Sequence, residues 1–263
     1  MKKIICFVIL FWTSLHFGQY RNIVASQMHS QFIEADTYLG EDTMGHQYFI
    51  KNNALFKLKG SEKWQYKNIS LGKITAVDVH NPLRILVFYE AFNTLIALDN
   101  QLNEVQKTNF NELTTPIITT AMGTASQNNY WLFNQNNQQL VLYNYIHQTI
   151  QNIGLFFEQP IKTYHTQFNY FYWVDSLNRY FRCDLFGKKE LLAQLPAYDN
   201  LYFSEESIVI YQKDDKIFLY DVKKQENIST EISQKSIKSC YYKNQNLAIF
   251  TAEGITNYKI NLP

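Results

Sequence analysis

A repeat of about forty residues constrains the fold of this chain more than any other feature of its sequence. The repeat is marked by a short apolar strand that ends in an acid, an amide or a lysine. The six marked ends are Lys59, Asp99, Asn144, Asp184, Asp221 and Lys259. Successive ends are separated by 37 to 45 residues. Such regular spacing is typical of repeat proteins, in which each unit buries its apolar face against the next unit.

Each repeat contains several short strand-like segments joined by turn residues. In the second repeat the segments are Ile74–Val79, Arg84–Tyr89, Thr94–Asp99 and Glu104–Thr108. Asn, Asp, Gln and Ser clusters separate them, and these residue types favour turns. Aromatic residues make up 16% of the chain, and such residues favour strands. No amphipathic helix of convincing length is present, so the chain is predicted to be all-β.

Four antiparallel strands in a unit of this length resemble a blade of a β-propeller. The resemblance covers residues 19–263, although the Gly-His and Trp-Asp pairs of WD40 repeats are absent. The chain is also similar to uncharacterised exported propeller-like proteins of outer-membrane bacteria, a resemblance of pattern that implies no activity.

The last repeat shows only three strands before the chain ends at Pro263. We therefore expect Tyr20–Ser26 to supply the outer strand of the sixth blade, since closure of the ring removes an exposed edge. Seven blades is the alternative, if residues 19–40 contain a further unit. A single domain over residues 19–263 is expected in either case.

The first eighteen residues have the pattern of a secretory signal peptide. Lys2 and Lys3 precede an uncharged run over residues 4–15, which is too short for an ordinary membrane span of about 20 residues. We place cleavage between Gly18 and Gln19, which leaves a nearly neutral mature chain with no membrane span. The protein is therefore expected to be exported, either to the periplasm or to the outer membrane.

Asp78 and His80 form the most suggestive polar cluster of the sequence, together with Asn81. They could act as an acid–base pair or as half of a metal site. A turn is the preferred interpretation, because the cluster lies where the first strand of its repeat must reverse, and because Asn and Pro favour turns.

Motifs of known cofactor, metal and catalytic sites are missing from the sequence. His residues show no H-x-x-x-H spacing, and neither C-x-x-C nor G-x-S-x-G occurs. We expect no metal, no cofactor and no catalytic residues. With a net charge of +1 and no basic stripe, nucleic acid is not an expected partner.

The remaining chemically distinctive residues have structural interpretations. Cys183 and Cys240 fall in blades four and six, which are not neighbours, so they are predicted to stay unpaired. Trp131 and Trp173 occupy equivalent second strands, where packing between blades is favoured over stacking on sugars. Trp64 is expected in the fourth strand of blade one, where it would be exposed.

The innermost strands of a propeller line a central channel, and any small ligand is expected there. The candidate ligand-binding residues on or beside predicted first strands are Asp36, Asp78, His80, Lys162, His165 and Lys238. The leading functional hypothesis is nevertheless a non-enzymatic module that binds another envelope protein, because Tyr and Trp in loops suit protein contacts. A carbohydrate- or small-ligand-binding propeller is the alternative, followed by a hydrolase or lyase that pairs Asp78 with His165.

Overall fold

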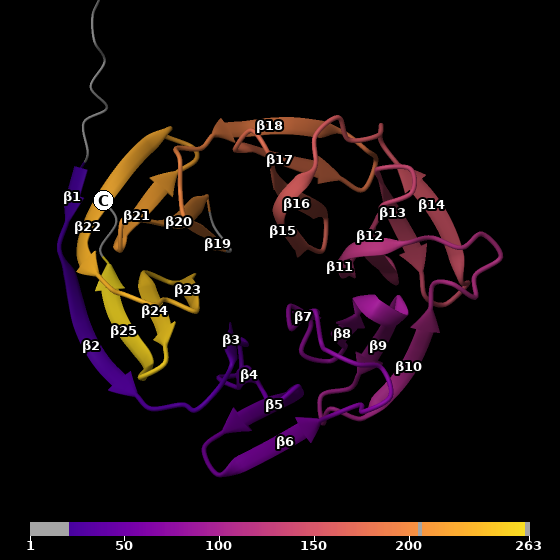
Figure 1. Cartoon of the computed structure of the whole chain (residues 1–263), viewed down its shortest axis with the longest axis horizontal. Coiled ribbons are helices and arrows are strands. Elements are labelled where there is room, and N and C mark those ends of the chain that lie inside the picture. Colours follow the sequence, from indigo (N-terminus) through magenta and orange to yellow (C-terminus); the bar gives the residue numbers. More distant parts are fainter. Residues whose placement is uncertain (1–20, 205–206, 261–263) are drawn as a thin grey trace, which may run out of the picture.

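A computed structural model describes residues 21–204 and 207–260 as a ring of six β-sheets around a central channel (Figure 1). Each sheet contains four antiparallel strands, and one sheet carries an additional parallel strand. In five sheets the four strands follow chain order from the channel outwards, whereas in the sixth the outermost strand comes from the N-terminal segment. The protein is therefore a six-bladed β-propeller, as the repeat predicts. The alternative of seven blades is not adopted by the residues that the structure describes.

The first three blades follow the repeat predicted from the sequence. Blade one contains β3 (Thr37–Glu41), β4 (Gln47–Lys51), β5 (Ala54–Lys59) and β6 (Glu62–Tyr66). Blade two contains β7 (Ala76–Asp78), β8 (Ile85–Tyr89), β9 (Thr94–Leu98) and β10 (Glu104–Asn109), with a single 3-10 turn, η1 (Glu90–Phe92), between β8 and β9. Blade three contains β11 (Thr119–Ala125), β12 (Asn129–Asn134), β13 (Gln139–Asn144) and β14 (Thr149–Ile153).

The other three blades complete the ring and include the N-terminal strands. Blade four contains β15 (Ile161–Gln167), β16 (Tyr170–Asp175), β17 (Arg179–Asp184) and β18 (Lys189–Gln194). Blade five contains β19 (Asn200–Phe203), β20 (Ile208–Lys213), β21 (Lys216–Asp221) and β22 (Glu226–Ser233), and β1 (Arg21–Ile23) is added at its edge. Blade six contains β23 (Ser239–Lys243), β24 (Asn246–Thr251), β25 (Gly254–Ile260) and β2 (Ala25–Gln31).

Pairs of polar residues with positive φ close several of the hairpins. Two-residue hairpins favour turns in which both central residues have φ > 0, because the twist of these turns matches that of the strands. Asn and Asp tolerate this backbone region better than most other residues. The pairs with left-handed backbone are Asn52 and Asn53, Gln127 and Asn128, Asp214 and Asp215, and Asn244 and Gln245. The polar clusters between strands thus set the reversals that the sequence analysis attributed to them.

Aromatic packing between neighbouring blades forms much of the core. Trp131 and Trp173 are fully buried in a cluster shared by blades three and four. The indole Nε1–H of Trp131 donates to the carbonyl of Gln167 at 3.0 Å, and Phe157 stacks on Trp173 at 4.3 Å between ring centroids. The prediction that these tryptophans pack between blades is confirmed. Trp64 differs from expectation: it lies in β6 but is half-buried, because its ring packs against His46.

The N-terminal segment closes the ring in a different register from the one predicted. β2 (Ala25–Gln31), rather than residues 20–26, pairs with β25 as the outer strand of blade six. Residues Arg21–Ile23 instead pair in parallel with β22 of blade five, where the side chain of Ile23 is buried. Tyr20 and the predicted signal peptide lie outside the described residues. Closure by an N-terminal strand is confirmed, and the range Tyr20–Ser26 is corrected.

Candidate site at the mouth of the central channel

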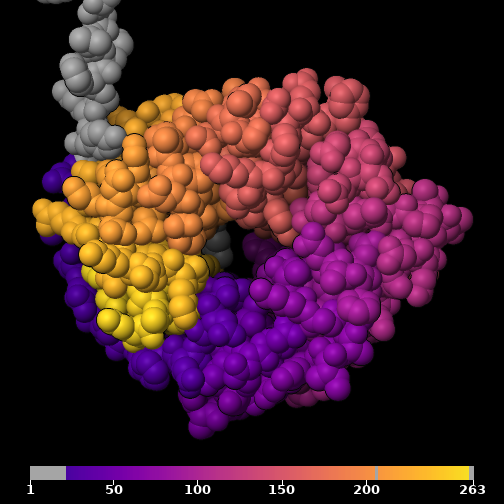
Figure 2. Space-filling view, viewed as in Figure 1, coloured from indigo at the N-terminus to yellow at the C-terminus, as the bar shows by residue number. Residues whose placement is uncertain are grey.

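The six innermost strands run in the same direction along the channel, so all of them end at one mouth. A cavity of about 840 Å³ lies at this mouth, and every innermost strand contributes at least one residue to its wall. A hollow at the centre of the ring is visible in the space-filling view (Figure 2). Polar and aromatic side chains alternate around it. They include Glu41, Asp42, Asp78, His80, Tyr164, His165, Phe168, Asn169, Phe203, Tyr241 and Lys243.

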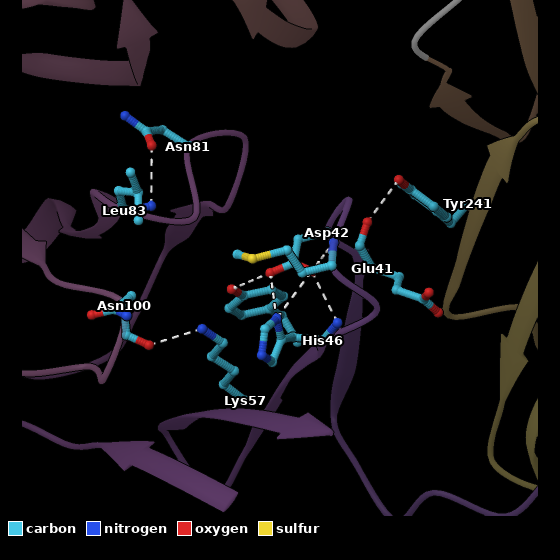
Figure 3. A network of polar contacts seen from close by, with 10 residues as sticks. Glu41, Asp42, His46, Lys57, Asn81, Leu83, Asn100 and Tyr241 are labelled. Atoms are coloured by element: carbon cyan, nitrogen blue, oxygen red, sulfur yellow. Dashed lines mark hydrogen bonds and ion pairs between the residues drawn. The ribbon is translucent and has the colours of Figure 1, made fainter. Parts of the chain in front are cut away.

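Blade one places a fixed carboxylate on the wall of this cavity. One carboxylate oxygen of Asp42 accepts backbone N–H bonds from Met44 and His46, both at 2.9 Å, and the other accepts the Tyr48 hydroxyl at 3.0 Å (Figure 3). The Nδ1 atom of His46 lies 2.9 Å from the same carboxylate. Burial opposes ionisation, but these hydrogen bonds outweigh it and lower the pKa of Asp42. Asp42 is therefore an anion that is held in place at neutral pH.

Blade two contributes the Asp78–His80 cluster, which the structure shows to be a turn. One carboxylate oxygen of Asp78 accepts the backbone N–H of His80 at 2.8 Å. Its other oxygen accepts the backbone N–H of Thr124 in blade three at 2.6 Å. The His80 ring meets Phe168 of blade four edge-on, with 4.8 Å between centroids. Asp78 thus ties two innermost strands together, and His80 presents an imidazole to the cavity.

Blade four contributes His165, which lies between aromatic rings. Its imidazole stacks on Tyr172 and on Phe203, each at 4.4 Å between centroids. Its Nε2 lies 3.2 Å from the Tyr180 hydroxyl. Burial, with His80 nearby, lowers the pKa of His165 to about 3. The side chain is thus neutral at physiological pH, and its hydrogen-bonding partner is Tyr180 rather than Asp78.

The cavity brings together half of the six residues predicted from the sequence. Asp78, His80 and His165 line it, whereas Asp36, Lys162 and Lys238 do not. The second group lies at or before the starts of first strands, and the mouth lies at their ends.

The three residues outside the cavity have structural contacts instead. The carboxylate of Asp36 accepts the backbone N–H of Asn52 at 2.7 Å. Lys162 donates to the Asn178 side chain at 3.1 Å, and Lys238 donates to the Ala35 carbonyl at 3.1 Å. Asp36 and Lys162 thus stabilise corners of their own blades, whereas Lys238 joins blade six to the segment that precedes blade one.

Sequence reasoning missed several residues of the cavity wall, among them Glu41, Asp42, Phe168 and Tyr241. These residues lie at the ends of first strands or in the loops that follow them. Strand direction was the signal that could have found them, because it separates residues of one mouth from residues of the other.

Both cysteines of the described residues lie in environments that disfavour the thiolate. Cys240 lines the cavity, and burial raises its pKa well above the usual range. Burial, with the Asp184 carboxylate nearby, raises the pKa of Cys183 to about 12. Both are free thiols in the part of the chain that the structure describes. Within the same residues no group of three His, Cys, Asp or Glu side chains could hold a metal ion.

Comparison with known proteins identifies the architecture and nothing finer. No protein-family model matches the chain, and no curated protein sequence matches it. The fold has many solved counterparts. A member of the DUF4221 family from Bacteroides vulgatus superposes with a TM-score of 0.62 at 8% identity, over 93% of this chain and 97% of that one.

Two further counterparts differ widely in function. Virginiamycin B lyase from Staphylococcus aureus has a TM-score of 0.59 at 12% identity, over 86% of this chain and 80% of the lyase. The Cps50 (Swd1) β-propeller domain of Myceliophteria thermophila has a TM-score of 0.61 at 9% identity, over 90% of this chain and 100% of that one. Likeness at such identities establishes a shared fold only.

Proposed function

We propose that this protein is an exported β-propeller that binds a carbohydrate, or a polar ligand of similar size, at the mouth of its central channel. The observation that carries the proposal is the cavity of about 840 Å³, to which all six blades contribute. Ligand sites in proteins typically measure about 300–1,000 Å³ and combine apolar walls with a few convergent polar groups. The sequence favoured a protein-interaction module, and the open cavity supports ligand binding as the first candidate.

The mixture of groups on the wall suits a sugar. Phe168 is 40% exposed, and its ring offers an apolar surface beside the imidazole of His80. Exposed carboxylates such as that of Glu41 accept hydrogen bonds from hydroxyl groups, while amides such as Asn169 both donate and accept. A ligand with hydroxyl edges and flat carbon faces would satisfy both kinds of contact.

Binding is favoured over catalysis because the titratable groups of the mouth are poorly prepared for proton transfer. A general base is most effective when its pKa lies near the working pH. The pKa of His165 is about 3, and the Asp78 carboxylate is occupied by two backbone N–H groups. The thiol of Cys240 is protonated at neutral pH and is a weak nucleophile.

Export is supported by the sequence that precedes the propeller. The basic pair Lys2 and Lys3 and the uncharged run that follows have the order of a signal peptide. No helix among the described residues is long and apolar enough to cross a membrane. We place the mature protein, beginning at Gln19, in the periplasm or at the outer membrane.

A second candidate function, as a binding module for an envelope protein, is favoured by an apolar patch on the rim. Leu155, Phe156 and Phe186 are 83%, 65% and 92% exposed. They lie beside a backbone contact between Gly154 and Gly187, which joins blades three and four. Exposed aromatic residues that cluster in this way often mark protein contacts.

Calorimetric titration of the purified protein against a panel of monosaccharides and short oligosaccharides tests the proposed ligand class. At least one sugar should bind, and Phe168→Ala should weaken its binding by about tenfold, or about 1.4 kcal/mol. The matched control is Phe186→Ala, which removes an exposed ring far from the cavity and should bind as the wild type does. Equal affinity of both variants, or no binding by any sugar, would contradict the proposal.

A further inference from the structure

A second hollow adjoins the channel mouth where the ring closes. It measures about 300 Å³ and lies between blade six and blade one. Four residues line both this seam hollow and the channel cavity, namely Glu41, Asp42, Tyr241 and Lys243. A ligand seated at the mouth could therefore extend into the seam without leaving the protein surface.

The seam hollow follows one row of side chains across blade six. Tyr241 of β23 is paired with Ala248 of β24, Ala248 with Asn257 of β25, and Asn257 with His29 of β2. All four residues line the hollow. Neighbouring strands lie about 4.8 Å apart, so the row extends roughly 14 Å from the channel towards the rim. Ala248 is small and leaves space in the middle of the row.

Tyr241 holds the junction between the two hollows. Its hydroxyl donates to the Glu41 carbonyl at 3.1 Å, as the close view shows (Figure 3). Its ring lies so close to Gly40 that a Cβ there would meet it at 2.8 Å. The contacts of Tyr241 therefore join blades six and one at the place where the mouth and the seam hollow meet.

The chemistry of the seam hollow suits a neutral hydroxylated ligand. The carboxamides of Gln47, Asn244 and Asn246 border it, and all three residues are partly or fully exposed to solvent. A carboxamide both donates and accepts, as a sugar hydroxyl does. Tyr38 and Ile255 provide buried apolar surface beneath them.

The charges at the junction argue against an acidic ligand. The carboxylate of Glu41 is exposed there and that of Asp42 is buried beside it, so two negative charges stand against one ammonium group on Lys243. A peptide is also a poor fit, because peptides commonly bind by pairing with a free strand edge. The wall of the seam is formed by side chains of blades six and one, and the strands β24 and β25 that cross its middle are paired on both sides.

We propose that the protein binds a neutral oligosaccharide, with one sugar unit in the channel mouth and a following unit in the seam between blades six and one. This inference rests on the proposed function and adds a second subsite and a minimum length to it. The first unit contacts the aromatic wall near Phe168, and the next lies along the row from Tyr241 to His29.

The test measures the affinity of the purified protein for neutral sugars of one, two, three and four units, and for unrelated peptides of matched length. Wild-type protein should bind the longer sugars with roughly tenfold higher affinity than the single unit, which corresponds to about 1.4 kcal/mol. The double variant Gln47→Ala/Asn246→Ala should lose this gain and keep its affinity for the single unit. The matched control Gln101→Ala/Asn152→Ala removes two exposed carboxamides from blades two and three and should behave as the wild type.

The outcomes separate the inference from the function on which it rests. Binding that does not depend on sugar length, or a length effect that survives in the seam variant, would overturn the second subsite and leave the channel site intact. Absence of binding by every sugar would overturn both. Binding of the peptides in place of the sugars would contradict the proposal that the ligand is a carbohydrate.

Discussion

The environment of His165 differs strongly from that of a free side chain in water. Two aromatic rings enclose its imidazole, and its Nε2 lies beside the Tyr180 hydroxyl. Burial first, and His80 second, lower its pKa from 6.5 to about 3. The fold thus accommodates the neutral ring and disfavours the charged one.

We predict that this histidine makes the protein less stable in acid. As the pH falls from 6.5 towards 3, the unfolded chain binds a proton at His165 and the folded chain does not. The free energy of unfolding then decreases by at most about 1.4 kcal/mol per pH unit from this group. Urea denaturation between about pH 7 and about pH 4 should show a shallower decrease in His165→Gln than in the wild type.

The exposed His147 provides the control for this measurement. His147→Gln should keep the pH dependence of the wild type, because its ring is not enclosed by protein. The measured quantity is the slope of the free energy of unfolding against pH. A loss of stability in His165→Gln that is the same at every pH does not change this slope. Identical slopes for His165→Gln and the wild type would contradict the prediction.

Single residues also explain why the repeat could be recognised from the sequence. Asn144, Asp184 and Asp221 end the third strands of blades three to five, and Asp99 directly follows the third strand of blade two. Each side-chain oxygen accepts the backbone N–H two residues later, at distances of 2.8, 3.1, 2.9 and 2.9 Å. Such Asx turns depend only on residues that are neighbours in the chain, so a sequence reveals them directly. At Lys59 the next residue is Gly60, whose φ of +58° makes the turn instead.

At the scale of elements, the N-terminal segment is the part of the fold that the sequence predicted least well. The side chains of β2 are nearly all exposed, so the strand lacks the alternation of buried and exposed residues that marks most strands. Its place is determined by pairing with β25, a partner more than 200 residues away. Local pattern could predict that a strand closes the ring, but could not locate it within the segment.

Gly254 permits this closure and supports a prediction about it. A Cβ at Gly254 would lie 2.3 Å from the Gln31 carbonyl oxygen of β2, and its φ is +114°. Gly60 also has positive φ, but a Cβ there would meet nothing within 4 Å. Gly254→Ala should therefore displace the end of β2 and destabilise the protein by several kcal/mol, against about 1 kcal/mol for Gly60→Ala.

Thermal unfolding and light scattering measure the two consequences of the Gly254 substitution. The midpoint temperature of unfolding should fall further in Gly254→Ala than in Gly60→Ala. Aggregation of Gly254→Ala should also increase, because β25 loses part of its partner strand. If the two variants unfold at the same temperature, β2 does not contribute to stability through this contact.

At the scale of the whole molecule, the ring brings distant residues to one mouth. Glu41 and Lys243 border the same hollow although about 200 residues separate them. The sequence could place residues on innermost strands, since strands repeat regularly. It could not show which residues converge, because that depends on strand direction, on closure and on the register of all six blades. Three of the six predicted residues therefore lie outside the cavity at this mouth.

The ring also separates two surfaces that could act independently. The channel mouth is concave and mixes polar with aromatic groups, whereas the rim patch of Leu155, Phe156 and Phe186 is convex and apolar. Burying one phenylalanine side chain in an interface is worth about 1.5–3 kcal/mol. A protein partner bound through this patch would thus depend strongly on Phe186, the most exposed of its residues.

We predict that Phe186→Ser weakens capture of any envelope protein that docks on the rim by more than about tenfold. Ile69→Ser is the matched control, because Ile69 is 88% exposed but lies in the connection between blades one and two, away from the patch. Affinity capture from gently solubilised envelopes, followed by salt washing and quantitative mass spectrometry, compares both variants with the wild type. A stoichiometric companion that is lost from Phe186→Ser and kept by Ile69→Ser would identify the rim as a docking surface. A companion retained equally by both variants would exclude the patch and direct attention to the channel mouth, where Phe168→Ala would then be expected to release it.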